Sequence, residues 1–296
     1  MALVRKVFLS GNIFINVFIY IYVYIYIYIK KIKGGFEGNG CILADDMGLG
    51  KTLQSITLLY TMLKQGFKPN DKLVKKAIIV CPTSLVKNWD NELDKWLKAA
   101  GGVQKIALSE ATREICISGI ATWVKPNTAP ILIISYETFR IHVQRFKNAS
   151  CDLMICDEAH RLKNAATLTN IALSSLKCNR RVLLSGTPMQ NDLEEFYAMV
   201  DFTNPGLLGD SRTFNKNYMR PILDGREPDS SDFSKRKGEE RSEELSNVVN
   251  KFILRRTNAL LAAHLPPKVY IYKHCFHDET VGDMYIFIYI YHNTNR

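Results

Sequence analysis

Residues 41–52 read CILADDMGLGKT, and this stretch decides the fold. Its first four residues are typical of a short buried strand, and a glycine-rich turn follows them. An amphipathic helix comes next and stops at Gly66, with one face formed by Leu53, Ile56, Leu59, Tyr60 and Leu63. A strand, a turn that ends in Gly-Lys-Thr and a helix together indicate a phosphate-binding loop.

The glycines of such a loop let backbone N–H groups face an anion, and the helix N-terminus adds a favourable dipole. The Lys51 amine then reaches the β- and γ-phosphates, and the Thr52 hydroxyl ligates Mg²⁺. We therefore predict a site for ATP and Mg²⁺ formed by Asp46, Met47, Gly48, Leu49, Gly50, Lys51 and Thr52. The strict pattern has glycine where this chain has Asp45, so the loop alone does not decide between a phosphate site and an ordinary helix cap.

An acid pair, Asp157-Glu158, favours the phosphate site. The pair directly follows residues 151–156, a strand-like run that reads CDLMIC. In a parallel sheet both acids and Lys51 would lie in the crevice at the carboxyl ends of the strands. Asp157 would hold Mg²⁺ through water and Glu158 would polarise the attacking water, so these two acids and Lys51 are the predicted catalytic residues. The alternative is that the acids only cap a strand where it meets solvent.

Three further apolar runs also end in small polar residues. They are 77–81, followed by Pro82 and a helix that Thr83 and Ser84 open; 131–134, followed by Ser135 and Tyr136; and 182–184, followed by Ser185, Gly186 and Thr187. On the helix after Pro82, the expected buried face consists of Leu85, Trp89, Leu93 and Trp96. Five or more apolar strands separated by helix-length segments predict an α/β fold with a doubly wound parallel sheet.

Composition sets outer limits on the class of protein. The chain has 296 residues, of which 47% are hydrophobic and 23% charged, and this excludes wholesale disorder, a collagen-like chain and a polytopic membrane protein. The net charge of +10 suits a polyanionic partner. Residues 1–33 contain five basic residues and no acid, so they carry half of this charge and the rest of the chain is only mildly basic. The seven cysteines are odd in number and lie partly in apolar runs, so we expect buried free thiols and neither zinc ligands nor disulfides.

Both ends of the chain alternate Ile and Tyr, in Val17–Ile29 and again in 285–291. The first run is shorter than the ~20 residues that span a bilayer as a helix, so we expect no membrane anchor. A translated TA dinucleotide repeat would give the same alternation. We interpret residues 1–33 and the tail 269–296 as β-prone, low-complexity segments outside the native domain.

Seven blocks in order carry a resemblance to a known family. They are ADDMGLGKT (Ala44–Thr52), VCPTSLVKNW (Val80–Trp89), IISYE (Ile133–Glu137), DEAHRLKN (Asp157–Asn164), LLSGTPMQND (Leu183–Asp192), FILRRT (Phe252–Thr257) and LPPK (Leu265–Lys268). They resemble the Swi/Snf-type DNA-dependent ATPases of the superfamily-two helicase-like proteins, in which an acid is usual at the position of Asp45. Three other segments resemble the Rad-fifty-four branch of homologous-recombination DNA translocases: Val200–Gly209, Pro221–Asp229 and Gly238–Leu245.

The resemblance implies an ATP hydrolase with two RecA-like lobes that moves along double-stranded DNA in the nucleus, in recombinational repair and chromatin remodelling. Residues 34–206 would be the ATP-binding first lobe, and 207–268 its helical extension, with a loop at Asp224–Asp232. Thr83, Ser84, Ser135 and Tyr136 match blocks that contact the DNA backbone without reading sequence. Ser185 and Thr187 match the block that couples the nucleotide to DNA. A strand-exchange recombinase and nucleosomes are the further partners that the family implies.

The chain also departs from the family. The adenine-binding Gln that precedes the loop in the family has no counterpart, because the first Gln here is Gln54. The second lobe with its arginine finger, a group worth ~10³–10⁵ in rate, would also be absent. We therefore expect this polypeptide to bind Mg-ATP weakly, to hydrolyse it negligibly and not to translocate.

Two alternatives stay open. The first is a stand-alone nucleotide-binding or DNA-binding module without motor activity. The second is an RNA helicase of the Asp-Glu-Ala-His class, which is disfavoured because those enzymes usually carry Ser-Ala-Thr where this chain has Ser185-Gly186-Thr187.

Overall fold

A computed structural model describes residues 40–65, 72–162, 167–178, 180–186 and 192–257, together with the backbone of 269–277 and 284–292. The chain divides into two compact units, Met1–Arg256 and Thr257–Arg296. No helix in the described residues is both long enough and apolar enough to cross a membrane.

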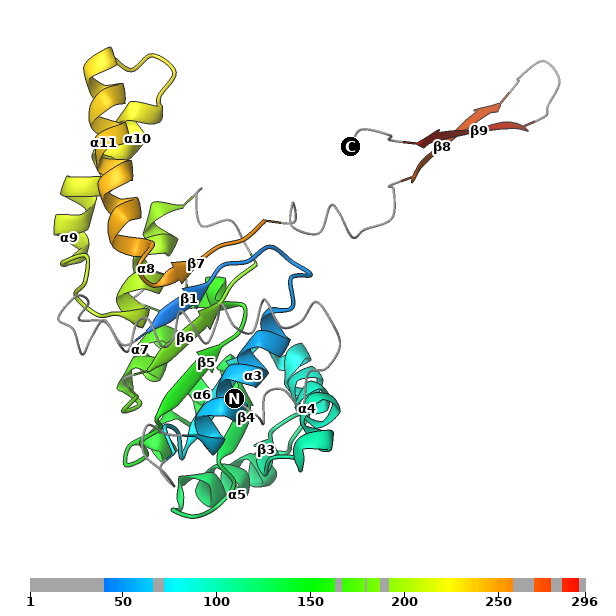
Figure 1. Ribbon diagram of the computed structural model, residues 1–296, viewed down its shortest axis with the longest axis vertical. Helices are drawn as coiled ribbons and strands as arrows, with labels where there is room; N and C mark the ends of the chain where they lie inside the picture. Colours follow the sequence, from blue (N-terminus) through cyan, green and yellow to red (C-terminus); the bar gives the residue numbers. More distant parts are fainter. Residues whose placement is uncertain are drawn as a thin grey trace. The chain divides into compact units, whose positions relative to one another are not determined.

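The first unit is built on a seven-stranded sheet (Figure 1). Its strands are β1 (Cys41–Leu43), β2 (Ala77–Cys81), β3 (Lys105–Ala107), β4 (Ile131–Ser135), β5 (Leu153–Cys156), β6 (Arg181–Leu184) and β7 (Ile253–Leu254). They lie in the order β3-β4-β2-β5-β6-β1-β7, and every pair is parallel. This arrangement confirms the predicted α/β fold with a doubly wound parallel sheet.

The sequence did not reveal β3 and β7, the two edge strands. Edge strands are covered less completely than central ones, and the three residues of β3 and the two of β7 are only half-buried. The five central strands are buried along their whole length. Their long apolar runs therefore stood out in the sequence, whereas the edges did not.

Helices cover both faces of the sheet. They are α3 (Lys51–Lys64), α4 (Thr83–Leu97), α5 (Arg113–Val124), α6 (Tyr136–Ile141), α7 (Leu168–Ser175) and α8 (Leu193–Thr203), with 3-10 turns η1 (Lys98–Ala100), η2 (Val143–Phe146) and η3 (Ala159–Leu162). Helix α3 packs against α4, and α6 packs against α7. Because parallel crossovers are right-handed, the strand order places α3 and α4 on one face and α5, α6 and α7 on the other.

Helix α4 begins at Thr83 as predicted, but its buried face differs slightly from the predicted one. The fully buried residues are Val86, Trp89, Leu93 and Leu97, whereas Leu85 and Trp96 are only partly buried against the core. Helix α3 ends at Lys64, and its predicted stop, Gly66, lies outside the described residues.

A helical segment follows α8 and projects from the sheet (Figure 1). It comprises α9 (Ser211–Phe214), the π-helical turn η4 (Asn215–Met219), α10 (Arg220–Arg226) and α11 (Asp232–Val249). Helix α10 contains Asp224, so the loop is shorter than the predicted Asp224–Asp232. Two glycines let α10 and α11 approach closely, since a Cβ on Gly238 would lie 2.9 Å from the carbonyl oxygen of Pro221 and one on Gly225 would lie 2.8 Å from that of Ser234.

The second unit contains an antiparallel pair, β8 (Val269–His277) and β9 (Met284–His292). Its register places Ile271 opposite Ile290 and Tyr272 opposite Tyr289. The β-prone character expected of the Ile/Tyr alternation is thus confirmed for this segment. Residues 1–39, which hold the first alternating run, lie outside the described residues.

The cysteines behave as small apolar residues. Six of the seven (Cys41, Cys81, Cys116, Cys151, Cys156 and Cys178) are buried with free thiols, as the sequence predicted. The side chain of Cys275 is outside the described part. Burial, the largest cause, raises the pKa of the Cys156 thiol to about 12, which keeps it protonated and unreactive.

Candidate functional site

The glycine-rich turn between β1 and α3 has the backbone conformation of an anion-binding loop. Gly48 and Gly50 have φ angles of 85° and 76°, in the left-handed region that glycine adopts without strain. Gly50 precedes α3 and makes no side-chain cap to it. The N–H groups of the first turn of α3 therefore lack this usual intramolecular acceptor, and such a turn offers donors to an anion.

Lys51 lies at the centre of the turn. Its Nζ donates to the carbonyl oxygens of Asp45 and Asp46, at 2.7 and 3.1 Å. The segment after β6 also reaches this amine, because a Cβ built on Gly186 would lie 3.5 Å from Lys51 Nζ. The predicted coupling block and the predicted phosphate loop thus meet at Lys51.

Ser185, at the end of β6, is fully buried, and its N–H donates to the carbonyl of Leu43 in β1 at 3.0 Å. This bond fixes the coupling block to the strand that leads into the loop. Thr187, the other predicted coupling residue, lies outside the described residues.

Asp157 follows β5 and is held from several directions. Its Oδ2 accepts from Trp89 Nε1 at 2.8 Å, and its Oδ1 accepts from the N–H of Glu158 at 2.9 Å. Its carbonyl oxygen accepts from the hydroxyl of Tyr136 at 2.8 Å. Burial, the largest cause, raises the pKa of Asp157, and the charge of Glu158 acts in the same direction. The hydrogen bonds from Trp89 and from the N–H of Glu158 and the charge of Lys51 lower it.

Glu158 has a φ of 50°, an unusual conformation for a residue with a side chain. Such strain persists only where the surrounding structure holds it, and it concentrates at functional sites. The Oε2 of Glu158 lies 3.2 Å from Nδ1 of His160. The structure therefore gives this carboxylate an orientation and a neighbour that the sequence did not indicate.

The donors present fit Mg²⁺. Asp157 and Glu158 supply carboxylate oxygens, and Thr52 supplies a hydroxyl at the first turn of α3. In the described residues there is no cluster of three or more His, Cys, Asp or Glu that could enclose a metal ion. Mg²⁺ usually binds through one or two carboxylates and takes its other ligands from water and phosphate, and the acid pair and the Thr52 hydroxyl could supply the protein's share.

Asp45, which occupies the position of the missing glycine, forms an internal ion pair. It is fully buried and accepts from Arg256 Nε on both oxygens, at 3.1 and 3.0 Å, and from Nη2 of the same guanidinium. The backbone N–H of Arg256 also donates to Asp45 Oδ1 at 2.9 Å. Arg256 Nη2 donates to Gln54 Oε1 at 2.6 Å, and Gln54 Nε2 donates to the carbonyl of Leu49 at 2.9 Å. We call Asp45, Gln54 and Arg256 the loop clamp, because they tie both ends of the turn to the segment after β7.

Sequence reasoning placed Trp89 on the buried face of its helix but found neither its hydrogen bond to Asp157 nor the clamp. Asp45 and Arg256 are 211 positions apart, and a single sequence does not pair residues at that distance. One signal was present: an acid in the place of a loop glycine, next to a buried strand, needs a cationic partner.

The four predicted DNA-contact residues divide into two pairs. Thr83 and Ser84 are exposed at the start of α4. Ser135 and Tyr136 are 1% and 2% exposed, so their side chains do not reach the surface in this structure. Ser135 instead caps α6 by accepting from the N–H of Thr138 at 2.9 Å.

Comparison with known proteins gives consistent results. Residues 23–290 match the model of the SNF2-related domain. The chain is 62% identical over 243 residues to Protein CHROMATIN REMODELING 25 of Arabidopsis thaliana, covering 81% of this chain and 26% of that protein. It is 63% identical over 233 residues to DNA repair and recombination protein RAD54 of Oryza sativa subsp. japonica, covering 78% and 24%. With the human DNA repair and recombination protein RAD54-like it shares 47% identity over 237 residues, covering 78% and 31%.

A solved structure agrees with these sequence matches. The Sulfolobus solfataricus SWI2/SNF2 ATPase core in complex with dsDNA superimposes with a TM-score of 0.62 at 28% identity, covering 81% of this chain and 44% of that one. The resemblance deduced from the seven blocks, including its branch, is therefore confirmed. The chain spans about a quarter of the length of the first two plant relatives.

Proposed function

Because the chain belongs to the family of SNF2-related domains, we propose that it forms the nucleotide-binding lobe of an ATP-driven motor that acts on double-stranded DNA in recombinational repair. The observation that carries this proposal is the convergence of three separate blocks on one point. The Lys51 amine lies 3.5 Å from the position that a Cβ on Gly186 after β6 would take, and the charge of Lys51 lowers the pKa of Asp157 after β5. A lysine, oxygen ligands and unshared helix N–H groups are the set that a magnesium–triphosphate complex requires.

Each side chain has a distinct proposed role. Lys51 exchanges its two carbonyl acceptors for phosphate oxygens and neutralises their charge. Thr52 and Asp157 would hold Mg²⁺, which supplies charge neutralisation at the phosphates when it is bound. Glu158, whose carboxylate lies 3.2 Å from His160 Nδ1, positions the attacking water and accepts its proton.

DNA would bind at the start of α4. This helix of 15 residues follows Pro82, which makes no side-chain cap, and it presents Thr83 and Ser84 to solvent. A phosphate of the DNA backbone can accept from the Ser84 hydroxyl and from the helix N–H groups. Thr83 Oγ1 donates to Glu137 Oε2 at 3.1 Å, so a phosphate would have to replace that carboxylate as its acceptor. Such contacts do not read sequence, so affinity should fall steeply with salt. Trp89 lies on the same helix and donates a hydrogen bond to Asp157, so α4 connects the proposed DNA-contact end to the proposed Mg²⁺ ligand.

The relatives are named as proteins of DNA repair, recombination and chromatin remodelling. We extend these roles to the protein of which this lobe is a part. A nuclear location, and partnership with a strand-exchange recombinase and with nucleosomes, follow as parts of the same proposal.

The test compares two lysines at opposite ends of α3. Lys51→Ala should weaken binding of a fluorescent ATP analogue in the presence of Mg²⁺ by about tenfold or more, because a charge-assisted bond is worth about 1.5–3 kcal/mol. Lys64→Ala, which removes an equal charge from the exposed last turn, should leave binding unchanged. Equal affinity of the two variants would overturn the assigned site.

A second assay separates a motor lobe from a simple binding module. Adding double-stranded DNA should increase nucleotide affinity or turnover, since α4 connects Thr83 to Asp157 through Trp89. Turnover of this chain alone should stay well below about one per second, the lower end of typical enzyme values. Nucleotide binding that does not respond to DNA would favour the module.

A further inference from the structure

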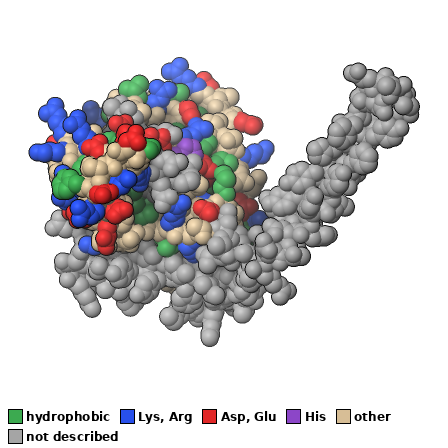
Figure 2. Space-filling view, turned by 90° about the horizontal axis from the view of Figure 1, so that it is seen from above, with side chains coloured by type: hydrophobic (Ala, Val, Ile, Leu, Met, Phe, Trp, Pro, Cys, Tyr) green, Lys and Arg blue, Asp and Glu red, His purple; other side chains and the backbone are tan. Residues whose placement is uncertain are grey.

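Charge does not single out a docking patch on the face that Figure 2 shows, because Lys and Arg side chains are mixed there with Asp and Glu. The interior holds a more specific feature, a pair of cysteines at the amino ends of two neighbouring strands. Cys151 lies just before β5 and Cys178 lies just before β6. The proposed function uses neither residue, and both thiols are free in this structure.

The register of β5 and β6 places the two cysteines opposite each other. The parallel bridge between Ser150 and Lys177 continues this register beyond the amino ends of both strands. Cys151 and Cys178 are the next pair in the same register. The N–H of Cys151 donates to the carbonyl oxygen of Lys177 at 3.0 Å, so the two backbones are in direct contact beside the thiols.

This position meets the geometric requirement for a disulfide. Neighbouring strands lie about 4.7–4.9 Å apart, and paired residues direct their side chains to the same face of the sheet. The Cα atoms of a disulfide usually lie about 4.4–6.8 Å apart, so the backbone need not move for a bond between Cys151 and Cys178. A side-chain hydrogen bond already joins the two thiols. Both residues are 6% exposed, so the reactant that reaches them has to be small.

The two thiols are not equivalent. The pKa of Cys178 is lowered, chiefly by the hydrogen bond from Cys151. A backbone hydrogen bond at Arg180 and the charge of Arg181 act in the same direction, against burial and the charge of Asp152. The pKa of Cys151 is raised, chiefly by its bond to Cys178 and by burial. Cys178 is therefore the sulfur that ionises first, and the thiolate is the form that attacks an oxidant.

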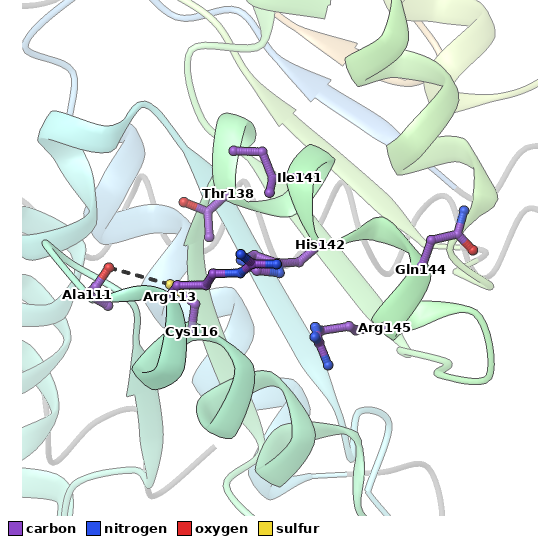
Figure 3. A pocket seen from close by; sticks show the side chains of 8 residues that line it. All are labelled: Ala111, Arg113, Cys116, Thr138, Ile141, His142, Gln144 and Arg145. Carbon is purple, nitrogen blue, oxygen red and sulfur yellow. Dashed lines mark hydrogen bonds between the residues drawn. The ribbon is translucent and has the colours of Figure 1, made fainter.

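Two other parts of the chain give a contrast. Cys156 in β5 pairs with Val80 in β2, so the next residue, Cys81, points to the opposite face of the sheet. Cys116 lines a cavity of about 820 Å³, and its thiol donates to the carbonyl oxygen of Ala111 at 3.7 Å (Figure 3). None of the described residues that line this cavity is a second cysteine, and burial raises the pKa of Cys116. Cys116 is therefore a matched control, a buried thiol beside a cavity without a partner sulfur.

We propose that Cys151 and Cys178 form a redox-sensitive site, which hydrogen peroxide converts into an intramolecular disulfide. The Cys178 thiolate attacks one peroxide oxygen, the O–O bond breaks, and the products are a sulfenic acid and, after protonation, water. The sulfur of Cys151 then attacks the sulfur of Cys178, the S–S bond forms, and the hydroxyl leaves with the thiol proton as a second water. Each disulfide thus consumes one peroxide, and this inference does not depend on the proposed function.

The position of the bond predicts its effect. It would join the amino ends of β5 and β6, whereas the proposed nucleotide site lies at the carboxyl ends of the strands. It would also close a loop of chain that contains Asp157, Glu158 and α7. Because a closed loop restricts the unfolded chain, oxidation should raise the melting temperature by about 5–15 °C.

The test treats the complete chain with hydrogen peroxide, unfolds it and alkylates the thiols that remain. Two of the seven cysteines should escape alkylation. After digestion with trypsin, mass spectrometry should find residues 148–161 joined to residues 178–180, with fragment ions that place the bond at Cys151 and not at Cys156. Dithiothreitol should separate the two peptides. A bond between other cysteines, or no bond within the chain, would overturn the proposal.

Three alanine variants test the role of each sulfur, and urea unfolding establishes that each variant is folded. Cys116→Ala should keep both the linked peptides and the rise in melting temperature. Cys151→Ala should stop at a sulfenic acid on Cys178, which dimedone labels. Cys178→Ala should give neither the linked peptides nor a label on Cys151. Loss of the bond in Cys116→Ala, a label on Cys151 with none on Cys178, or a fall in melting temperature on oxidation would each contradict the proposal.

Discussion

Removal of the Arg256 side chain tests the loop clamp. In the Arg256→Ala variant, Asp45 keeps the backbone N–H of residue 256 and loses the guanidinium that contacts both of its oxygens. The side chains of Arg256 and Asp45 are 11% and 0% exposed, so water does not replace the lost partner well. Breaking a buried pair in this way costs about 3–5 kcal/mol, because a charge stays buried without compensation.

This loss is large compared with the total stability of a protein. Native chains are stable by about 5–15 kcal/mol, so the variant should lose about a fifth of its free energy of unfolding or more. In a thermal melt, about 2–4 °C is lost per kcal/mol for a unit of 150–250 residues, which predicts a fall of about 6–20 °C. Urea unfolding of both proteins measures the difference directly.

Two further variants make this interpretation decisive. Arg241→Ala removes an arginine from an ion pair whose side chains are 43% and 48% exposed, and it should cost about 0.5 kcal/mol or less. The double variant Asp45→Asn/Arg256→Met removes both charges and should recover about 2 kcal/mol or more relative to Arg256→Ala. If Arg256→Ala is as mild as Arg241→Ala, or if the double variant recovers nothing, the clamp does not stabilise the loop as argued.

Three other predictions concern separate parts of the lobe. Gly238→Ala should destabilise the chain in urea although alanine favours helices, because its Cβ would lie 2.9 Å from the carbonyl of Pro221; a gain in stability would refute the close packing. Trp89→Phe removes the donor to Asp157, costs about 1.5–3 kcal/mol, and should raise the Mg²⁺ concentration needed for nucleotide binding, whereas an unchanged requirement would mean that the bond does not position Asp157. The pKa of His142 is lowered from its ordinary value of about 6.5, so protonation of His142 is unfavourable in the folded state. The folded chain should therefore keep its full stability above about pH 6.5 and lose part of it as the pH falls below that value. His142→Gln should reduce this loss between pH 7.5 and 5.5, and an identical pH profile would show that His142 is not the group responsible.

The fold was predictable because its centre is made of uninterrupted apolar strands. Runs such as Ala77–Cys81 and Ile131–Ser135 are buried along their whole length, and a strand buried on both faces leaves a continuous signal. The edge strands lack that signal. The small rotation of α4, which buries Val86 instead of Leu85, depends on tertiary packing that periodicity alone does not resolve.

The site was predictable where chemistry requires particular residue types in a local pattern. Lys51 and Asp157 belong to such patterns, and the charge of Lys51 lowers the pKa of Asp157. Ser135 and Tyr136 show the limit, since a polar residue at a strand end can serve the fold as readily as a ligand. Tyr136 turns inward and its hydroxyl donates to the carbonyl of Asp157. The clamp residue Arg256 was out of reach, because its partner is distant in sequence.

The most direct test of the account is a crystal structure of this chain with Mg²⁺ and a non-hydrolysable ATP analogue. We predict that the phosphates accept from the backbone N–H groups of Gly48–Thr52 and from Lys51, and that Mg²⁺ lies between Thr52 and Asp157. A nucleotide bound elsewhere, or a phosphate loop that stays empty at saturating nucleotide with Lys51 still on the carbonyls of Asp45 and Asp46, would contradict it.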